Sequence, residues 1–254
     1  MDNKTGTQSI SRVIQVLKII AQYGENGIRL IDLAETLSLP RPTVHRLLKA
    51  LIVEGMLVQE TDSRRYKLGP LIFELGLAAA HSFNLRDLCE PVLQELSQST
   101  GDTAFLFVRS GNEAVCLNRK QGTYPIQTPS LPIGSRQPLG VNAGGLALLA
   151  NLASKEAEGV LTNIAPYLSS YGNLNVEELR QLTDRARERG YAAIANWAVP
   201  GVSAIGMPVI SPSGITVAAL TIAATETRMT QERVNEILPL LSSAVVQLSQ
   251  LLRR

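Results

Sequence analysis

The sequence predicts an α+β protein built from two domains of unequal size. The chain has 254 residues, which at roughly 100–200 residues per domain fits one large domain or two modest ones. Helical periodicity dominates as far as residue 99, whereas strand and helix patterns alternate from residue 101 onward. Hydrophobic residues make up 45% of the chain and aromatic residues only 4%. The cores are therefore expected to be aliphatic.

The first 69 residues contain the patterns of three helices and a β-hairpin. Apolar residues at helical spacing predict helices over 9–23, 29–37 and 41–54, and Pro42 fits the first turn of the third. Two extended runs, 56–59 and 65–68, flank a polar turn. This order is typical of a winged helix-turn-helix. Its third helix can enter the major groove of DNA, and its basic hairpin can contact phosphates.

The basic residues are concentrated in the same region. Residues 1–69 carry ten Lys/Arg and seven Asp/Glu, a net charge of +3, whereas the rest of the chain carries fourteen and fifteen, a net charge of −1. The third predicted helix places Arg41, Thr43, His45, Arg46 and Lys49 around the side opposite its apolar stripe. We expect His45 on this outer side rather than in the core. The charge distribution indicates a nucleic-acid reader joined to a second, near-neutral domain.

The rest of the chain begins with an apolar segment and continues with mixed α and β patterns. We predict a helix over 70–81 that links the domains and packs on a second subunit; the alternative is that it caps its own domain. The further predicted helices cover 84–99, 142–152, 154–161, 176–189 and 230–252. The predicted strands cover 103–108, 114–118, 191–195, 203–210 and 215–223. The range 119–137 is expected to form a loop with short strands.

Several functions are disfavoured by what the sequence lacks. The only histidines are His45 and His81, so the last 173 residues hold no imidazole for a catalytic triad or a multi-histidine metal site. The glycine-rich run 140–145 is not followed by the lysine of a phosphate loop. Ser203 lacks the second glycine of a nucleophile elbow, because Ile205 stands there. We expect no enzyme activity, no metal and no cofactor.

The chain has neither an N-terminal signal pattern nor an 18-residue apolar run. Its two cysteines, Cys89 and Cys116, form no CxxC pair, and Cys116 is expected to be a small core residue rather than a redox sensor. These features predict a cytoplasmic protein that does not span a membrane.

Three stretches together resemble the IclR family of bacterial transcription regulators over nearly the whole chain: SLPRPTVHRLLKALIVEGMLVQETDSRRYKLG, QPLGVNAGGLALLA and GYAAIANWAVPGVSAIGMPVISPSGITVAALTIAA. The resemblance implies a winged helix-turn-helix over residues 1–69, a linker helix over 70–84 and a GAF-like effector-binding domain over 85–254. It also implies homodimers or dimers of dimers.

The resemblance carries particular residues onto two sites. The recognition helix and wing would contact DNA through Arg41, Pro42, Thr43, His45, Arg46, Lys49, Arg64, Arg65 and Tyr66. The effector pocket would be lined by the segment 141–145 and by the last strands, which places Ala143, Gly144, Ala204, Thr221 and Ala223 near the ligand, with Phe107, Ile194 and Trp197 nearby. Because aromatic residues are few, Phe105, Phe107 and Trp197 are the rings near which an apolar effector would sit. Trp197 would stack on the effector or, alternatively, pack in a core or interface. Arg109, Arg119 or Arg136 could pair with a ligand carboxylate, although surface charge is the default interpretation.

The implied function is sequence-specific regulation of transcription, controlled by a small metabolite. The partners would be double-stranded operator DNA with inverted-repeat half-sites and a small organic effector, carboxylic or aromatic. Ile194 and Leu146 make the pocket more apolar than is usual in the family. The resemblance to this family slightly favours a repressor over an activator. The alternatives are a regulator without a ligand and, less favoured, an enzyme fused to a DNA-binding module.

Overall fold

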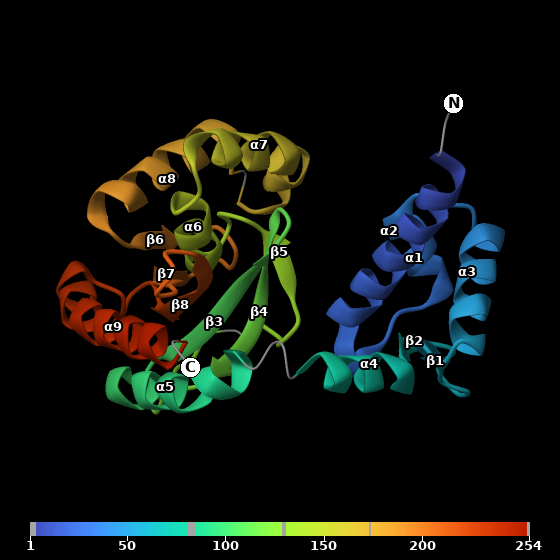
Figure 1. The fold of residues 1–254 in the computed structure, drawn as a ribbon, viewed down its shortest axis with the longest axis horizontal. Coiled ribbons are helices and arrows are strands. Elements are labelled where there is room, and N and C mark those ends of the chain that lie inside the picture. The colour runs from blue at the N-terminus through green and yellow to red at the C-terminus, as the bar shows by residue number, and fades with distance from the viewer. Residues whose placement is uncertain (1–3, 81–84, 129–130, 173, 253–254) are drawn as a thin grey trace. The chain divides into compact units, whose positions relative to one another are not determined.

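The chain divides into two compact units, Met1–Asn84 and Leu85–Arg254. The computed structural model describes residues 4–80, 85–128, 131–172 and 174–252 (Figure 1). One hydrophobic core fills the N-terminal unit, and two cores lie in the C-terminal unit.

The N-terminal unit contains the predicted helices and hairpin in the predicted order. Its elements are α1 (Lys4–Tyr23), the 3₁₀ turn η1 (Gly24–Asn26), α2 (Leu30–Leu37), α3 (Arg41–Val53), β1 (Leu57–Gln59), β2 (Tyr66–Leu68) and α4 (Pro70–Ala80). Helix α1 begins five residues before the predicted start, in a polar stretch without apolar periodicity. The predicted end of the linker helix, at residue 81, lies outside the described residues.

A tight turn sets the angle between α2 and α3. Ser38 adopts a left-handed conformation with φ of 53°, and its N–H donates to the carbonyl oxygen of Glu35. Pro40 precedes α3, and Pro42 lies in its first turn, where a missing N–H costs nothing. Leu33 on α2 and Val44 and Leu48 on α3 are fully buried. The opposite side of α3 therefore faces solvent.

The C-terminal unit is organised around a six-stranded antiparallel sheet of order β5-β4-β3-β8-β7-β6. The strands are β3 (Thr103–Ser110), β4 (Glu113–Lys120), β5 (Arg136–Pro138), β6 (Ala192–Ala195), β7 (Val202–Ile210) and β8 (Thr216–Thr225). The predicted loop over 119–137 thus contributes to β4 and β5 only at its two ends. The remaining strands lie within two residues of their predicted bounds.

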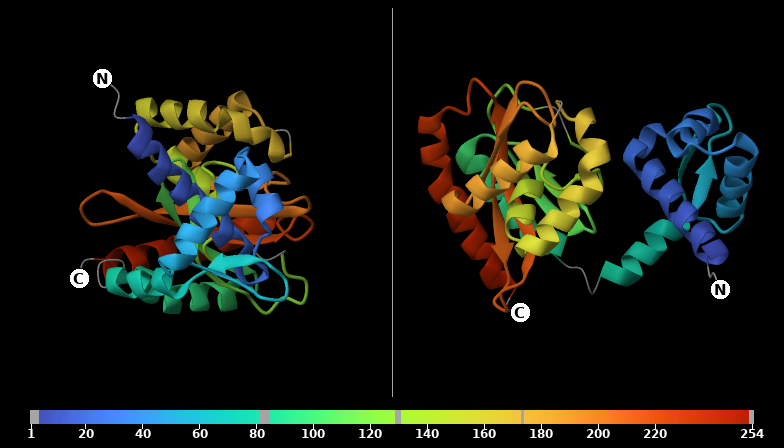
Figure 2. Two further views of the ribbon diagram at one scale, coloured as in Figure 1. Left: turned by 90° about the vertical axis from the view of Figure 1, so that its right-hand side faces the viewer. Right: turned by 90° about the horizontal axis from the view of Figure 1, so that it is seen from above.

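Helices cover both faces of this sheet (Figure 2). Their bounds are α5 (Leu85–Thr100), α6 (Ala143–Ala150), α7 (Ser154–Ile164), α8 (Val176–Arg189) and α9 (Gln231–Leu251), with a 3₁₀ segment η2 (Ala165–Ser170) after α7. Helices α5 and α9 pack on one face around Leu106, whereas α6 to α8 pack on the other around Phe105 and Phe107. The alternation of side chains along β3 supplies both cores.

No helix within the described ranges is both long and apolar enough to cross a membrane.

Candidate nucleic-acid interface and ligand pocket

The outer side of α3 is a continuous polar and basic surface. Arg41, Pro42, His45, Arg46 and Lys49 are exposed there, and Thr43 is half-exposed. Within the described part of the chain, no ion pair involves Arg41, Arg46 or Lys49. Exposed cations without acidic partners are available to bind phosphate oxygens or guanine edges.

The hairpin turn presents one further cation to solvent. Arg64 is exposed and has a φ of 55°, the left-handed conformation of a tight turn. Glu60 holds the rest of the turn: it pairs with Lys67 and accepts a hydrogen bond from Ser63 Oγ at 2.6 Å. These two bonds, chiefly the one from Lys67, lower the pKa of the Glu60 carboxyl. Lys67 is therefore occupied within the hairpin, and Arg64 is the cation left at its tip.

Tyr66 and Arg65, the other two predicted DNA contacts of the wing, are less exposed than Arg64. The Tyr66 side chain is only 5% exposed and belongs to the core, and its N–H donates to Ile28 O at 2.8 Å. Burial raises the pKa of its phenol. Arg65 is half-buried, and its Nη1 donates to Gly27 O at 2.9 Å. The structure thus gives Tyr66 a packing role, because Tyr66 and Leu68 share the face of β2 that packs against the core of the N-terminal unit.

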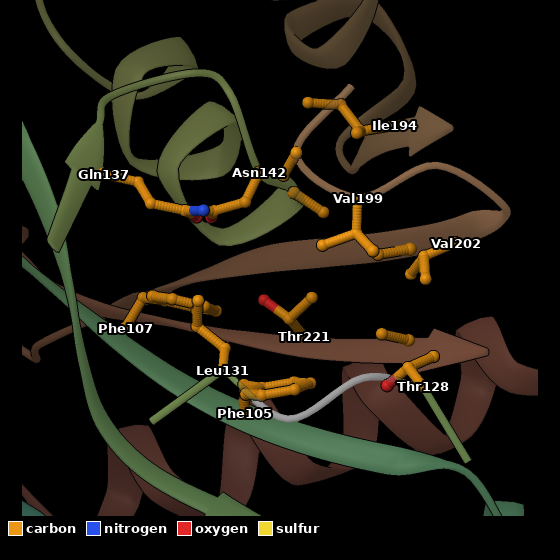
Figure 3. Close-up of a pocket in the computed structure, with 14 residues that line it drawn as sticks. Phe105, Phe107, Thr128, Leu131, Gln137, Asn142, Ile194, Val199, Val202 and Thr221 are labelled. Atoms are coloured by element: carbon orange, nitrogen blue, oxygen red, sulfur yellow. The ribbon is translucent and has the colours of Figure 1, made fainter. Parts of the chain in front are cut away.

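A pocket opens in the C-terminal unit on the sheet face that α6 covers (Figure 3). The space between its walls measures about 540 Å³, part of it open to solvent. Six of the predicted effector residues line it: Phe107, Ala143, Ile194, Ala204, Thr221 and Ala223.

Two predicted pocket residues do not line it. Gly144 lies beneath the ring of Phe107, and a Cβ at this position would come within 2.3 Å of Phe107 Cδ2. Trp197 is half-buried against the core on the α6 side of the sheet, with its ring beside Gly172. This position of Trp197 agrees with core packing, the interpretation that the sequence favours over stacking on a ligand.

The pocket has eight further lining residues: Phe105, Thr128, Leu131, Gln137, Asn142, Ala198, Val199 and Val202. Phe105 is one of the rings expected near an apolar effector, and Asn142 lies in the expected segment 141–145. Strand alternation agrees with Phe105 and could have identified Val202. Phe105 precedes Phe107 by two positions on β3, and Val202 precedes Ala204 by two on β7, so each shares a sheet face with a predicted residue. The loop residues have no such periodic signal.

The pocket contains few polar groups, and two of them bond to each other. Asn142 Nδ2 donates to Gln137 Oε1 at 2.7 Å, while Asn142 Oδ1 accepts the N–H of Gly145 at the start of α6. The hydroxyls of Thr128 and Thr221 are buried without a hydrogen-bond partner among the described residues. No described lining residue is charged.

The three arginines considered as carboxylate ligands do not line the pocket. Arg109 pairs with Glu156 at 2.6 Å, and Arg136 pairs with Glu113 at 2.8 Å. Over the described ranges, no group of three or more His, Cys, Asp or Glu side chains is placed to hold a metal ion. The described residues that line the pocket include no acid, base or charged nucleophile.

Comparison with known proteins places both units in one family. Residues 9–61 match the IclR helix-turn-helix domain, and residues 77–250 match the family described as bacterial transcriptional regulator IclR C-terminal. The chain is 29% identical over 231 residues to the HTH-type transcriptional repressor AllR of Salmonella typhi, covering 90% of this chain and 84% of that protein.

Solved structures share the fold. An IclR transcriptional regulator from Alicyclobacillus acidocaldarius is 24% identical, with a TM-score of 0.77 over 96% of this chain and 98% of its own. An IclR homologue from Microbacterium hydrocarbonoxydans, solved in complex with 4-hydroxybenzoate, is also 24% identical, with a TM-score of 0.73 over 96% and 99% of the two chains. The α+β fold and its N-terminal helix-turn-helix are those of these regulators.

The two family matches together cover most of the chain, and the relatives they join are transcriptional regulators rather than enzymes. An exposed basic α3 and a separate pocket-bearing unit are the parts that such a regulator needs. This chain belongs to the IclR family of DNA-binding bacterial transcriptional regulators.

Proposed function

We propose that the outer side of α3 reads operator DNA and that a small organic effector in the C-terminal pocket controls operator affinity. The observation that carries the first part is the exposed, acid-free surface of Arg41, Arg46 and Lys49. An α-helix with such groups can place them on base edges in the roughly 12 Å wide major groove. His45 and Thr43 lie on the same side and would contact bases or phosphates, and Pro42 would start the helix at the groove.

The wing has a separate role in this proposal. Arg64 contacts a phosphate, because its side chain is exposed at the tip of the hairpin. Arg65 stabilises the wing through the hydrogen bond that its side chain donates to Gly27 O. A phosphate contact adds affinity without sequence information, so Arg64 would fix the register of α3 on the duplex.

The second part of the proposal is effector control. The pocket is a concave, mostly apolar space, as small-molecule sites usually are, and the Microbacterium homologue was solved with 4-hydroxybenzoate. A ligand changes operator affinity only through its differential affinity for the two states of the protein. The similarity to the repressor AllR favours repression, with the effector releasing the operator.

Dimer formation is supported by α4. Its exposed side chains include Phe73, Leu75 and Leu77, which are 67%, 52% and 55% exposed. Apolar side chains of this size gathered on one short helix indicate a protein interface, and we propose a second copy of the chain as its partner. A dimer, or a dimer of dimers, would read inverted-repeat half-sites about one helical turn or more apart.

The test uses the full chain and an operator selected from random DNA. Arg46→Ala should weaken binding to that operator by about 1–3 kcal/mol and relax the preference at one base position. Lys155→Ala is the matched control, because Lys155 is exposed on α7 in the other unit. Equal affinities of the Arg46→Ala and Lys155→Ala variants, with an unchanged footprint, would remove Arg46 from the set of residues that recognise DNA.

A thermal-shift screen of small metabolites tests effector control, since a ligand that binds the folded state raises its melting temperature. Each compound that shifts the melting temperature is then added to the operator complex. Release of the operator supports the proposal. Binding without any change in operator affinity would favour the regulator without ligand control.

A further inference from the structure

The pocket walls are apolar on nearly every side, and the polar groups they hold are neutral. We propose that the pocket selects an uncharged ligand, with an apolar body against Phe105, Phe107 and Val199 and a hydroxyl or carbonyl group bonded to Thr221. This inference rests on the proposed effector function and names the chemical class of the effector.

The apolar body is indicated by two opposed walls. The rings of Phe105 and Phe107 project from β3 with centroids 5.8 Å apart and planes 25° apart, so they form one broad surface. Val199, Val202 and Ile194 belong to the lining contributed by β6, β7 and the loop between them (Figure 3). Apolar ligand surface buried between these walls stabilises the complex in proportion to its area.

The polar contact is indicated by Thr221. This residue on β8 is 2% exposed, and its Oγ1 is buried without a hydrogen-bond partner among the described residues. Figure 3 shows the Thr221 oxygen directed toward the space between Phe107 and Asn142. A buried hydroxyl without a partner is destabilising, so a ligand group that bonds to it gains affinity. Thr128, 6% exposed, offers a second hydroxyl of the same kind.

A carboxylate would find no countercharge in this space. Its transfer out of water is unfavourable unless the negative charge is paired, and Arg109 and Arg136 are already paired outside the lining. Arg119, which pairs with Phe105 across β3 and β4, is also outside the lining, although its Nη1 is buried without a hydrogen-bond partner among the described residues. The start of α6 carries a partial positive charge. However, the Asn142 side chain already caps this helix start, and the Phe107 ring lies directly on Gly144. The neutral lining should therefore bind an alcohol or an ester more tightly than the corresponding carboxylate.

The experiment compares ligands that differ only in charge. Calorimetry or ligand-observed NMR on the full chain measures two pairs: benzyl alcohol against benzoate, and methyl 4-hydroxybenzoate against 4-hydroxybenzoate. We expect the neutral member of each pair to bind at least about tenfold more tightly, because the charged member loses its hydration without gaining a partner. Equal or tighter binding of the carboxylates would overturn the proposal, as would no binding of either neutral compound at millimolar concentration.

Variants locate the contact. Thr221→Val should weaken binding of the neutral ligands about tenfold, and Thr221→Ser should restore most of it, because only the first removes the hydroxyl. Thr162→Val is the control, since Thr162 is exposed on α7. Val199→Arg should reverse the preference toward the carboxylates by supplying the missing countercharge. An unchanged preference in Val199→Arg, or equal affinities for Thr221→Val and wild type, would contradict the assigned contacts. Should Thr221→Val fail to fold, the ligand pairs and Val199→Arg still decide the question.

Operator binding is measured on the same preparations, which separates the two proposals. If the wild-type protein shows no specific operator binding, the proposed function of α3 is overturned, whichever ligands the pocket prefers. A preference for carboxylates combined with normal operator binding would overturn only the assignment of an uncharged effector.

Discussion

The ring of Phe107 on β3 lies directly against Gly144 in the first turn of α6. A Cβ at Gly144 would come within 2.3 Å of Phe107 Cδ2 and 2.9 Å of Thr221 Oγ1. Gly206 on β7 allows an equally close approach, because a Cβ there would lie 2.8 Å from Ala143 O. Two glycines without side chains thus let α6 reach the sheet beside Phe107, Ala143 and Thr221, which line the pocket.

Gly144→Ala should therefore destabilise the C-terminal unit, by about 1–3 kcal/mol, since the added methyl group overpacks a close contact. Gly159→Ala is the matched control. Gly159 is exposed on α7 with open space around it, so alanine should stabilise the helix by about 0.5–1 kcal/mol. Trp197 is the only tryptophan and lies in this unit, and its fluorescence in urea follows the unfolding. Opposite signs for the two variants are expected; a stabilising Gly144→Ala would contradict the close packing.

The two wing arginines should respond differently to removal. Arg64→Ala should reduce the slope of log affinity against log salt concentration by about 0.9, the value for one phosphate contact, and leave the fold intact. Arg65→Ala removes the bond to Gly27 O and should lower the stability of the N-terminal unit by about 1 kcal/mol. Filter binding over a salt series measures the first effect, and thermal unfolding the second. An unchanged salt slope for Arg64→Ala would place the wing away from DNA.

Sequence periodicity predicted the helices well because each buries one face, and the strands because they are short apolar runs bounded by turns. The helical stripe identifies the buried side of α3, and the alternation along β3, β7 and β8 assigns successive side chains to the two faces of a sheet that is covered on both. These patterns fail where a tertiary contact decides whether a side chain is buried. Tyr66 turns inward because β2 bridges to Ile28, 38 positions earlier in the sequence, and no local pattern encodes that pairing.

The pocket was predictable to the extent that strands build it. Its residues on β3, β6, β7 and β8 follow from alternation, whereas Thr128, Leu131 and Val199 lie on loops whose course depends on the packed sheet.

The 3₁₀ segment η2 was not expected from the periodic pattern. Pro166 stands near its start, and proline interrupts the helical hydrogen bonding on which that pattern depends.

Asp102 anchors the start of β3 to the start of α9. It is 2% exposed, and its carboxylate pairs with Arg228 at 2.6 Å and Arg233 at 3.3 Å. Arg228 also lies 3.8 Å above the centre of the Tyr124 ring. Asp102→Ala would leave two partly buried guanidinium groups without their shared partner and should cost about 3 kcal/mol in the free energy of unfolding.

Urea unfolding monitored by Trp197 fluorescence measures this loss. Asp184→Ala is the control, because Asp184 pairs with Arg187 on an exposed face of α8, where such pairs contribute at most about 1 kcal/mol. Equal effects of the two substitutions would show that the buried cluster contributes no more than a surface pair.

The two cysteines should resist modification while the protein is folded. Burial is the main cause that raises the pKa of both thiols, Cys89 and Cys116, from 9.0 to about 12. Since thiolate is the reactive form, iodoacetamide at pH 8 should label neither residue in the native protein and both after denaturation. Ser154→Cys, exposed at the start of α7, provides the reactive control.

Because the folded-state pKa values are raised, the stability that the buried thiols contribute is fully present below about pH 8. It is lost as the pH rises toward 12, so Cys89→Ala should flatten the alkaline limb of the stability profile. Rapid native labelling of Cys116 would contradict its role as a core residue and reopen a redox function.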